Sequence, residues 1–367
     1  MTLDSLNINN FKNIEHAQLA FSPKLNCLLG DNGMGKSNLL DAIYFLSFCK
    51  SFSGATDGML VKQGEDFSMI HAQYHRNDAE ETLDAALQPG RRKSLKRSGK
   101  EYKRLSEHIG KFPLVLVSPA DMELVNGSGE ERRRLMDMVI SQTDARYLDA
   151  LIRYGRALEQ RNRMLRDGIS DEALYMAVEL QMEAAAQYIS QVRREWVGKL
   201  SEIFQRYYAD IAGAVEVPSL EYQGHLAQPG VRLCDLFAER RARDAALKYT
   251  TAGPHRDDIA MQLSGMPLRR TASQGQAKTY TIALRLAQYD FLREATGIAP
   301  LLLLDDIFDK LDAGRVARII DVVSRQSFGQ IFITDTNRKH LDEIVPHMGS
   351  DYRMWSVENG IFQTIDI

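Results

Sequence analysis

The feature that most constrains the fold is residues 30–38, which read GDNGMGKSN between an apolar run (25–29) and a segment with helical apolar spacing (38–49). Residues 30–37 fit GxxxxGK[ST] at every position, and the order predicts a buried strand, a glycine loop and a helix. Glycines let backbone N–H groups surround an anion, and the helix adds its positive N-terminal end. We therefore predict a nucleotide-phosphate loop formed by Gly30, Asp31, Asn32, Gly33, Met34, Gly35, Lys36, Ser37 and Asn38.

Within this loop the two last motif residues have separate expected tasks. Lys36 is expected to reach the β- and γ-phosphates of a nucleotide, and Ser37 to bind Mg²⁺.

A second stretch, LLLLDDIFDKLD, spans residues 301–312. Four leucines predict a buried strand, and Asp305 at its carboxyl end can hold the Mg²⁺ that bridges Ser37 and the nucleotide. Asp306, next in the chain, could polarise an attacking water. Alone, this pattern fits a strand that ends in an acidic turn. Paired with the phosphate loop, it favours a site for a nucleoside triphosphate.

The third stretch places Ser273, Gln274, Gly275 and Gln276 at the start of an amphipathic segment, about 30 residues before Asp305. A small polar residue and a glycine at a helix start form a second anion-binding end. By itself the pattern fits an ordinary helix cap better. Because one loop already serves the chain's own nucleotide, the second helix start makes sense if it faces the nucleotide of another subunit.

The net charge of -3 implies that any DNA-binding surface is local. The one basic stretch that stands out is GRRKSLKRSGKEYKR, residues 90–104, which has a turn signal at Ser98 and Gly99. Its best candidates for phosphate-backbone contacts are Arg91, Arg92, Lys93, Lys96 and Arg97, since cations release counterions from a polyanion. A solvated hairpin with basic faces is an equally good interpretation. No motif indicates base-specific recognition.

Three cysteines, Cys27, Cys49 and Cys234, are far apart and lack CxxC spacing. This predicts reduced thiols, no zinc site and a cytoplasmic protein. No apolar run approaches the ~20 residues that span a bilayer, and residues 1–4 lack the features of a secretory signal. We therefore expect no membrane contact.

Strand patterns occupy both ends of the chain, and helical periodicity with charged faces occupies the middle. The sequence therefore predicts an α/β fold with two lobes. Residues 1–120 and 248–367 would form a P-loop lobe of mixed sheets with helices, and residues 121–247 an inserted helical lobe.

The three motifs together resemble the P-loop, signature motif and Walker B/D-loop of ABC-type ATPases, in that order. Eight stretches, in this order along the chain, indicate the subtype of ABC-type ATPase: NFKN, GDNGMGKSNLLDAIYFLS, KSF, NGSGEERRRLMD, YGRALEQRNRMLR, GPHRDD, SQGQ and LLLLDDIFDKLD. These resemble the bacterial RecF family, a relative of the SMC and Rad50 heads, over nearly the whole chain.

The resemblance implies an ABC-ATPase-like lobe, ATP and Mg²⁺ as cofactors, and an ATP-dependent head-to-tail homodimer that binds DNA. The DNA would be double-stranded, gapped or a single/double-strand junction. Recombinational repair, replication recovery, RecA loading and the SOS response are the implied processes, and RecR and RecO the implied protein partners.

The same resemblance assigns roles to motif residues. Lys36, Asp305 and Asp306 would be catalytic in a weak, DNA-stimulated ATPase that acts as a switch, and Ser37 and Asp305 would hold Mg²⁺. Ser273 to Gln276 would contact the partner's γ-phosphate. Asp309 and Asp312 would lie in the D-loop at the dimer interface.

Three positions depart from the patterns. Lys12 stands where the family usually has arginine, and a lysine lacks the planar bidentate contact. Residues 335–337, Asp-Thr-Asn, stand where transporter-type ATPases place a histidine that senses the γ-phosphate. Asp306 replaces the glutamate that many such enzymes use as base. Together these departures predict slow hydrolysis.

Other parts of the resemblance carry no firm assignment. For the GPHRDD stretch, residues 253–258, a dimer-facing, a DNA-facing and a purely structural position all fit. For Arg132 to Arg134 and for Arg161, internal salt bridges are favoured over DNA contacts.

Two alternatives remain at this point. An ATP-hydrolysing transporter subunit shares the fold, but it does not explain the Ser-Gln-Gly-Gln signature or the long insert. A P-loop kinase does not explain the motif at Ser273.

Overall fold

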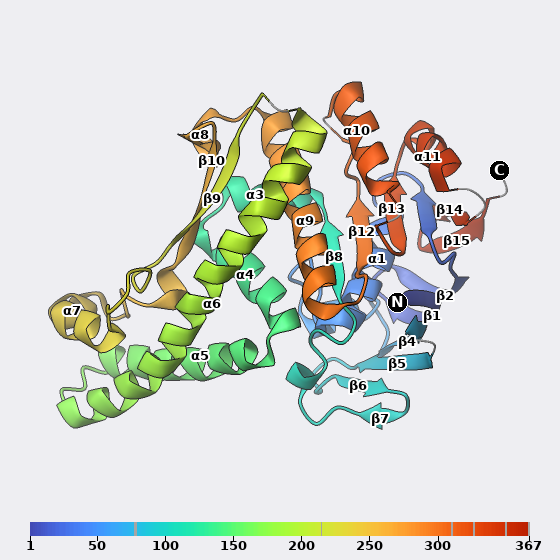
Figure 1. Ribbon diagram of the computed structural model, residues 1–367. Coiled ribbons are helices and arrows are strands. Elements are labelled where there is room, and N and C mark those ends of the chain that lie inside the picture. Colours follow the sequence, from blue (N-terminus) through green and yellow to red (C-terminus); the bar gives the residue numbers. More distant parts are fainter. Residues whose placement is uncertain (77–78, 214, 310, 326, 349–350, 366–367) are drawn as a thin grey trace. The chain divides into compact units, whose positions relative to one another are not determined.

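The computed structural model describes residues 1–76, 79–213, 215–309, 311–325, 327–348 and 351–365. The chain forms two compact units. Unit 1 comprises Met1–Asp121, Asp210–Ala212 and Gln274–Ile367, and unit 2 comprises Met122–Ala209 and Gly213–Ser273. Figure 1 follows the chain through its elements.

Unit 1 contains most of the strands. Its elements are β1 (Thr2–Phe11), β2 (Ile14–Ala20), β3 (Leu25–Leu29), α1 (Lys36–Phe48), α2 (Asp57–Leu60), β4 (Ser68–Arg76), β5 (Ala79–Leu87), β6 (Ser94–Arg97), β7 (Lys100–Glu101), β8 (Leu114–Val117), α9 (Gln274–Thr296), β12 (Leu301–Asp305), α10 (Ala313–Val323), β13 (Ile331–Asp335), α11 (Arg338–Ile344), β14 (Tyr352–Glu358) and β15 (Ile361–Thr364). Short 3₁₀ turns occupy Leu105–Glu107, Pro119–Asp121 and Val345–Met348.

The central sheet of unit 1 has the order β15-β14-β3-β13-β12-β8. Strands β14, β3, β13, β12 and β8 run parallel, and β15 pairs antiparallel at the edge. Every residue of β12 and β13 is buried, as expected for parallel strands covered on both faces. The leucine run 301–304 and the run Ile331–Ile333 are apolar for this reason.

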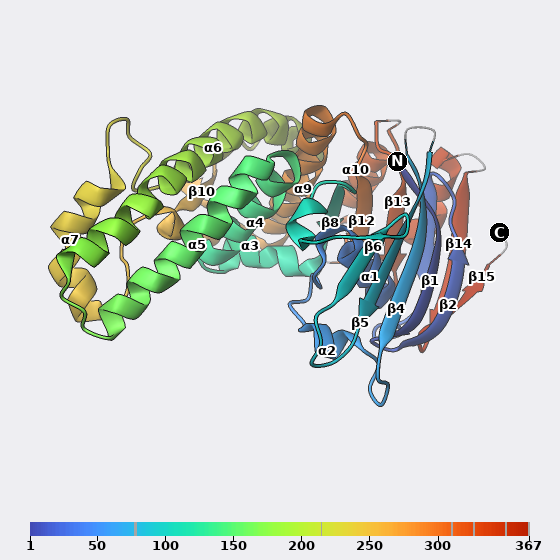
Figure 2. The same cartoon turned by 90° about the horizontal axis from the view of Figure 1, so that it is seen from below.

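A second sheet is antiparallel, with the order β2-β1-β4-β5-β6-β7. Figure 2 shows β2, β1, β4 and β5 side by side, and places α1 between this sheet and the central one. Helix α1 packs on β8, β12 and β13 and is buried along nearly its whole length. The helix that follows the phosphate loop is therefore a core element, which fixes the position of the loop.

Unit 2 contains α3 (Met122–Asn126), α4 (Gly129–Thr143), α5 (Ala145–Arg166), α6 (Glu172–Ala212, whose end counts with unit 1), β9 (Pro218–Gln223), α7 (Leu233–Leu247), β10 (Asp258–Leu263), β11 (Met266–Pro267) and α8 (Leu268–Thr271), with a 3₁₀ turn at Pro254–Arg256. Helices α5 and α6 form a hairpin, visible in Figures 1 and 2. Asp144 and Asp171 cap the two helices through hydrogen bonds from backbone N–H groups.

The GPHRDD stretch is built into the core of unit 2. Buried Arg193 of α6 donates to Asp257 Oδ2 at 2.9 Å, to Asp137 Oδ1 at 2.8 Å and to the Pro254 carbonyl at 2.7 Å. Arg132 donates to both carboxylate oxygens of Asp258, at 2.6 and 2.9 Å. Asp257 and Asp258 of the motif are thus paired with arginines of α6 and α4, and for these two residues the structural alternative holds.

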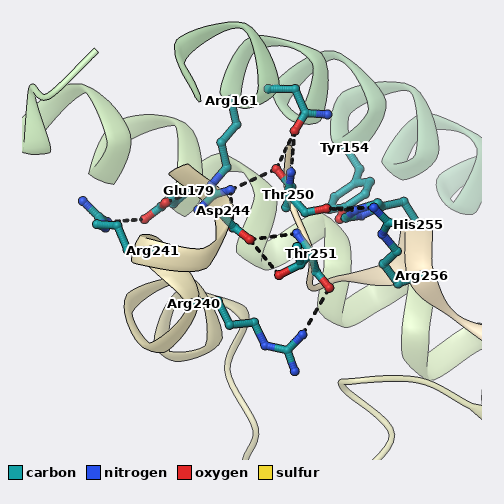
Figure 3. A network of polar contacts seen from close by, with 11 residues as sticks. Tyr154, Arg161, Glu179, Arg240, Arg241, Asp244, Thr250, Thr251, His255 and Arg256 are labelled. Carbon is teal, nitrogen blue, oxygen red and sulfur yellow. Dashed lines mark hydrogen bonds and ion pairs between the residues drawn. The ribbon is translucent and has the colours of Figure 1, made fainter. Parts of the chain in front are cut away.

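Arg161 is the second buried arginine of unit 2 (Figure 3). It donates to Glu179 at 3.0 Å and to Asp244 at 2.8 Å, and its guanidinium lies 4.0 Å from the Phe237 ring centroid. The predicted internal salt bridge is therefore confirmed for Arg161 and for Arg132, which pairs with Asp258. Arg133 instead donates to the Asp257 carbonyl at 2.8 Å. Arg134 is exposed and pairs with Glu130 and Glu131 of its own helix.

His255 is held in one neutral form by its two neighbours. Its Nε2 faces the Thr250 carbonyl at 3.0 Å and must carry the proton, so Nδ1 accepts from the Tyr154 hydroxyl at 2.7 Å. Burial lowers the pKa of His255 to about 4. Gly253 precedes this turn with φ 124°, and a Cβ there would lie 2.3 Å from the Tyr154 hydroxyl, so only glycine fits.

Two sequence-based expectations about this region differ from the structure. The sequence patterns assign residues 248–273 to the lobe of the chain ends, yet these residues group with unit 2, because β10 pairs with β9 and Asp257 and Asp258 bind α6 and α4. Residues 218–223 were expected to be helical but form β9. Its partner lies about 40 residues further along the chain, beyond what local periodicity reports.

The expectations about membrane spans and cysteines concern two further features of the fold. Among the described residues, no helix is both long enough and apolar enough to cross a membrane. Cys27, Cys49 and Cys234 are free thiols, and the first two are buried.

The neutral state of His255 predicts a pH dependence of stability. The unfolded chain binds a proton at this residue near pH 6.5 and the folded chain only near pH 4. The stabilisation from His255 is therefore complete above pH 6.5 and is lost as the pH falls towards 4. In His255→Gln, which keeps an N–H for the Thr250 carbonyl, the free energy of unfolding should fall less between pH 7 and 5 than in the unchanged protein.

Chemical denaturation at a series of pH values measures this difference. Burial also lowers the pKa of His108 to about 4 and lowers the pKa of His225, but these two histidines are common to both proteins and their contributions cancel. Identical slopes for the two proteins would contradict the assignment.

Candidate nucleotide-binding site

The candidate site lies where three adjacent parallel strands end. In the ladder, β13 stands between β3 and β12, with Leu29 opposite Asp335 and Thr334 opposite Asp305. The glycine loop follows β3, so it begins at the same sheet edge at which Asp305 and Asp335 end their strands. Carboxyl ends of parallel strands are the usual ligand edge of such sheets. The register therefore brings together motifs that are about 270 residues apart in sequence.

Backbone conformation and close packing explain why glycine occupies three positions of the loop. Gly33 and Gly35 have φ of 82° and 112°, in the region that side-chain-bearing residues avoid. A Cβ on Gly30 would lie 2.3 Å from the Val357 carbonyl oxygen of β14. The loop is thus tight against the sheet, and its backbone N–H groups are free of covering side chains at these positions.

Lys36 begins α1 and is only 3% exposed. Its ammonium group donates to the carbonyls of Gly30 at 2.6 Å and Asp31 at 3.1 Å. The charge is therefore held inside the loop, where the motif predicts contact with phosphates.

Ser37, Asp305 and Thr334 form a compact hydrogen-bonded group. The hydroxyls of Ser37 and Thr334 each donate to Asp305 Oδ1 at 2.8 Å. Burial raises the pKa of the Asp305 carboxyl, while the two hydroxyls and Lys36 act in the opposite direction. A buried carboxylate oxygen next to a serine hydroxyl suits Mg²⁺, which takes few protein oxygens and completes its shell with phosphate and water.

Asp306 has φ 45°, and its backbone N–H donates to Thr334 Oγ1 at 3.0 Å. Thr334 therefore fixes both acidic residues at once. Burial raises the pKa of the Asp306 carboxyl, and the negative charges of Asp305 and Asp335 add to this. A carboxylate with a raised pKa is suited to accept a proton from water.

Three residues near the loop were missed by sequence reasoning. Asn13 accepts from Asn38 Nδ2 at 2.8 Å and lies against Gly35. Thr334 belongs to none of the sequence motifs. His340 lies 2.8 Å from Asp335 Oδ2, with its ring 5.2 Å from that of Phe308. The residues at 335–337 lack a histidine, as noted above, yet one reaches Asp335 from the following helix.

Lys12, the departure in the NFKN stretch, is paired with Asp41 of α1. Asp41 is fully buried and also accepts from Ser51 Oγ at 2.6 Å and from the Phe52 N–H at 2.8 Å. Lysine thus satisfies a buried carboxylate on the helix that carries the phosphate loop.

Arg315 lies beside residues that were predicted for the signature and for the D-loop. Asp312 caps α10 by accepting from the Arg315 N–H at 2.9 Å, and a Cβ on Gly275 would lie 2.5 Å from Arg315 Nη1. Lys278 of α9 donates to the carbonyls of Asp306 and Asp309.

Helix α9 begins at Gln274, and Ser273 is the last residue of unit 2.

The basic hairpin separates into paired and unpaired cations. Lys93 binds Asp57 at 2.9 Å and the Cys49 carbonyl at 2.6 Å, and Arg97 binds Glu81 through two hydrogen bonds. Within the described residues, Arg91, Arg92 and Lys96 have no carboxylate within 4.0 Å and are exposed. Of the unpaired cations, Arg92 lines a cavity of about 410 Å³, together with residues that include Tyr102 and Lys103.

A phosphate loop and an acidic strand end on one parallel sheet, a glycine-containing helix start and an inserted second unit define the head of an ABC-type ATPase. A family model described as the RecF/RecN/SMC N terminal domain matches residues 2–362. The chain belongs to this family and, within it, to the RecF proteins. Its relatives include the DNA replication and repair protein RecF of Parabacteroides distasonis, 47% identical over 100% of both chains.

Other relatives agree. The RecF protein of Porphyromonas gingivalis is 48% identical over 99% of this chain and 100% of its own. The solved structure of the recombination mediator protein RecF-ATPrS in the RecFOR pathway has a TM-score of 0.89 and 27% identity, covering 99% of this chain and 98% of that one. An Smc head domain derived from Pyrococcus furiosus, at 16% identity and a TM-score of 0.58, shares the fold.

These findings confirm the predicted fold class and family. They also argue against the transporter subunit and the kinase, the two alternatives that the sequence left open.

Thr334 gives a test of the site geometry. In Thr334→Val, Asp305 loses one hydrogen bond and the Asp306 N–H loses its acceptor. Hydrogen bonds to charged groups are each worth about 1.5–3 kcal/mol, so Mg²⁺-dependent ATP binding or turnover should fall by roughly tenfold or more. Thr334→Ser keeps the hydroxyl and should stay close to the unchanged protein.

Titration with a fluorescent ATP analogue, with Mg²⁺ and with a chelator, measures the effect. Equal behaviour of the valine and serine variants would exclude Thr334 as the residue that positions the two carboxylates.

Proposed function

We propose that this chain is an ATP-gated DNA-binding protein of recombinational repair and replication recovery. The observation that carries the proposal is the contact of Ser37 with Asp305 beside the buried ammonium group of Lys36. The relatives supply the process, since they are DNA replication and repair proteins.

ATP would be bound by Gly30 to Asn38, with Lys36 on its terminal phosphates. Ser37 and Asp305 would hold Mg²⁺, which neutralises charge on the phosphates. Asp306 would orient and deprotonate the attacking water. An aspartate is one methylene shorter than the glutamate of many related enzymes, so we expect slow hydrolysis that resets a switch rather than drives a motor.

A second subunit would complete the site. Ser273 to Gln276 are proposed to contact the γ-phosphate held by the partner, and Asp309 and Asp312 to lie at the head-to-tail interface. Asp309 and Asp312 are exposed, and Arg315 joins the signature glycine to the D-loop. ATP then favours the dimer by as much as its affinity for the dimer exceeds that for the monomer.

The dimer is proposed to bind duplex or gapped DNA, or a single/double-strand junction, and hydrolysis to release it. DNA would in turn stimulate the weak ATPase. The relative solved with ATPrS acts in the RecFOR pathway. By analogy RecR and RecO are proposed partners, with RecA loading and the SOS response as the outcome. A cytoplasmic location follows from a chromosomal substrate.

Nucleotide-dependent DNA binding tests the switch. A fluorescent gapped duplex should bind tightly with ATP, and at least tenfold more weakly with ADP or without nucleotide at one fixed salt concentration. Lys36→Ala should remove the ATP effect, because the phosphates lose the charge held in the loop. Fluorescence anisotropy measures both. Equal binding in all nucleotide states would make any DNA role indirect.

The hairpin gives a second test. Among its candidates only the unpaired cations are kept for replacement, because Lys93 and Arg97 hold Asp57 and Glu81. The triple variant Arg91→Ala/Arg92→Ala/Lys96→Ala should weaken binding similarly for all sequences. It should also reduce the slope of log K against log salt by about 2–3, since each lost phosphate contact removes about one released counterion.

A charge-matched control is Lys111→Ala/Arg318→Ala/Lys339→Ala, which removes three exposed cations of unit 1 that lie outside the hairpin and, among the described residues, have no carboxylate within 4.0 Å. If both triple variants change the affinity and the salt slope equally, the hairpin has no specific part in DNA binding.

A further inference from the structure

The surface formed by Arg240, Tyr249 and Arg256 in unit 2 stands apart from the site described above. We propose that it is a second contact for nucleic acid, in which the two guanidinium groups bind phosphodiester oxygens and Tyr249 lies beside Arg256. This inference rests on the proposed DNA-binding function and names a surface that the phosphate motifs do not include. Figure 3 shows both arginines next to the polar network of unit 2.

The carboxylates in the interior of unit 2 already have cationic partners. Glu179 binds Arg161 and Arg241, and Asp244 binds Arg161. Asp257 and Asp258 bind Arg193 and Arg132. The buried acids therefore do not neutralise further cations at the surface.

Arg240 and Arg256 differ from these arginines. Within the part of the chain that the structure describes, neither has a carboxylate within 4.0 Å. Each is held instead on a backbone carbonyl: Arg240 Nη1 lies 3.2 Å from the Thr251 oxygen, and Arg256 Nη2 lies 3.4 Å from the Thr250 oxygen. The two charges are therefore anchored on consecutive residues, and Arg240 Nη1 also lies 3.3 Å from His225 Nε2. These contacts involve one nitrogen of each guanidinium group, so its other N–H groups remain able to donate to a ligand.

The carbonyls that hold the arginines belong to a fixed segment. Thr250 donates its N–H and hydroxyl to Asn162 Oδ1, at 2.8 and 2.7 Å. Thr251 donates its N–H and hydroxyl to Asp244 Oδ1, at 3.0 and 2.7 Å. Ordering the segment in advance lowers the entropic cost of binding a ligand there.

The nearby histidines leave the arginines as the source of positive charge. Burial lowers the pKa of His225 and His255, and the charge of Arg256 contributes to both shifts, with Arg240 contributing at His225. Both rings are therefore neutral near pH 7. The surface carries the charge of the two arginines, and no group described above opposes it.

The ligand class follows from the donor geometry and the aromatic neighbour. Planar guanidinium groups match the paired oxygens of phosphate. Arg256 lies 5.0 Å from the ring centroid of Tyr249, which is 41% exposed. Arginine beside an exposed aromatic ring is the combination with which proteins contact a nucleic-acid strand. We therefore infer a nucleic-acid backbone rather than an acidic protein.

The test uses the full chain with ATP and the gapped duplex. Arg240→Ala/Arg256→Ala should weaken binding about tenfold and reduce the slope of log K against log salt by about 2. Arg240→Lys/Arg256→Lys should recover most of the slope, because it retains the charge. The control Lys199→Ala/Arg206→Ala removes the same charge from exposed positions on α6 and should have little effect.

The outcomes separate the inference from the proposed function. If the unchanged protein does not bind the duplex, the DNA-binding function itself fails. If it binds and the arginine-to-alanine variant matches it in affinity and slope, only this surface is excluded.

Two further results would also contradict the inference that this surface binds nucleic acid. One is a loss of DNA affinity in Arg240→Ala/Arg256→Ala that is accompanied by a lower melting temperature, which would indicate damage to the fold. The single variant Arg256→Ala, at an exposed residue, then tests the surface in a folded protein, and an unchanged slope of log K against log salt would exclude it. The other is binding of a labelled polyglutamate by the unchanged protein that Arg240→Ala/Arg256→Ala abolishes, while DNA binding by the two proteins is the same. That result would indicate an acidic protein partner.

Discussion

The carboxylate of Asp305 is the interaction on which the nucleotide site depends. It is buried at the end of a strand and accepts hydrogen bonds from Ser37, on the helix after β3, and from Thr334, on β13. A buried carboxylate is costly without such partners. The bonds form only in the observed register of β3, β13 and β12, because a slip by one residue would turn Thr334 to the opposite face. Sheet pairing and site geometry are therefore one constraint.

Unit 2 uses the same physics for a structural purpose. Arg161 and Arg193 are almost fully buried, and each has two carboxylate partners. Removing one partner of such a pair typically costs about 3–5 kcal/mol, because the remaining charge stays buried. The GPHRDD stretch supplies Asp257 and Asp258 to these pairs and Gly253 to the turn. Its composition is thus explained by the arginines of α4 and α6, with only Arg256 left at the surface.

Sequence reasoning succeeded where the cause is local. The glycine loop, the leucine strand before Asp305 and the helices of the insert each have their signal within about 20 residues. Thr334 and Asn13 were missed because their roles come from a strand neighbour and a turn that are distant in sequence. The end of the insert was misplaced for the same reason, since residues 258–263 pair with a strand that precedes α7.

Charge is the property for which the sequence was least informative, because a cation counts at a surface only when no carboxylate matches it. The basic hairpin is conspicuous in the sequence, yet Lys93 and Arg97 are paired. Arg240 lies in an unremarkable stretch and Arg256 in the GPHRDD stretch, which had no firm assignment, yet neither has such a partner among the described residues. A chain with a net charge of -3 can bind a polyanion only through such local excesses. The fold creates them by matching Arg161, Arg193 and Arg132 with the acids of the interior, which leaves the remaining arginines to set the surface potential.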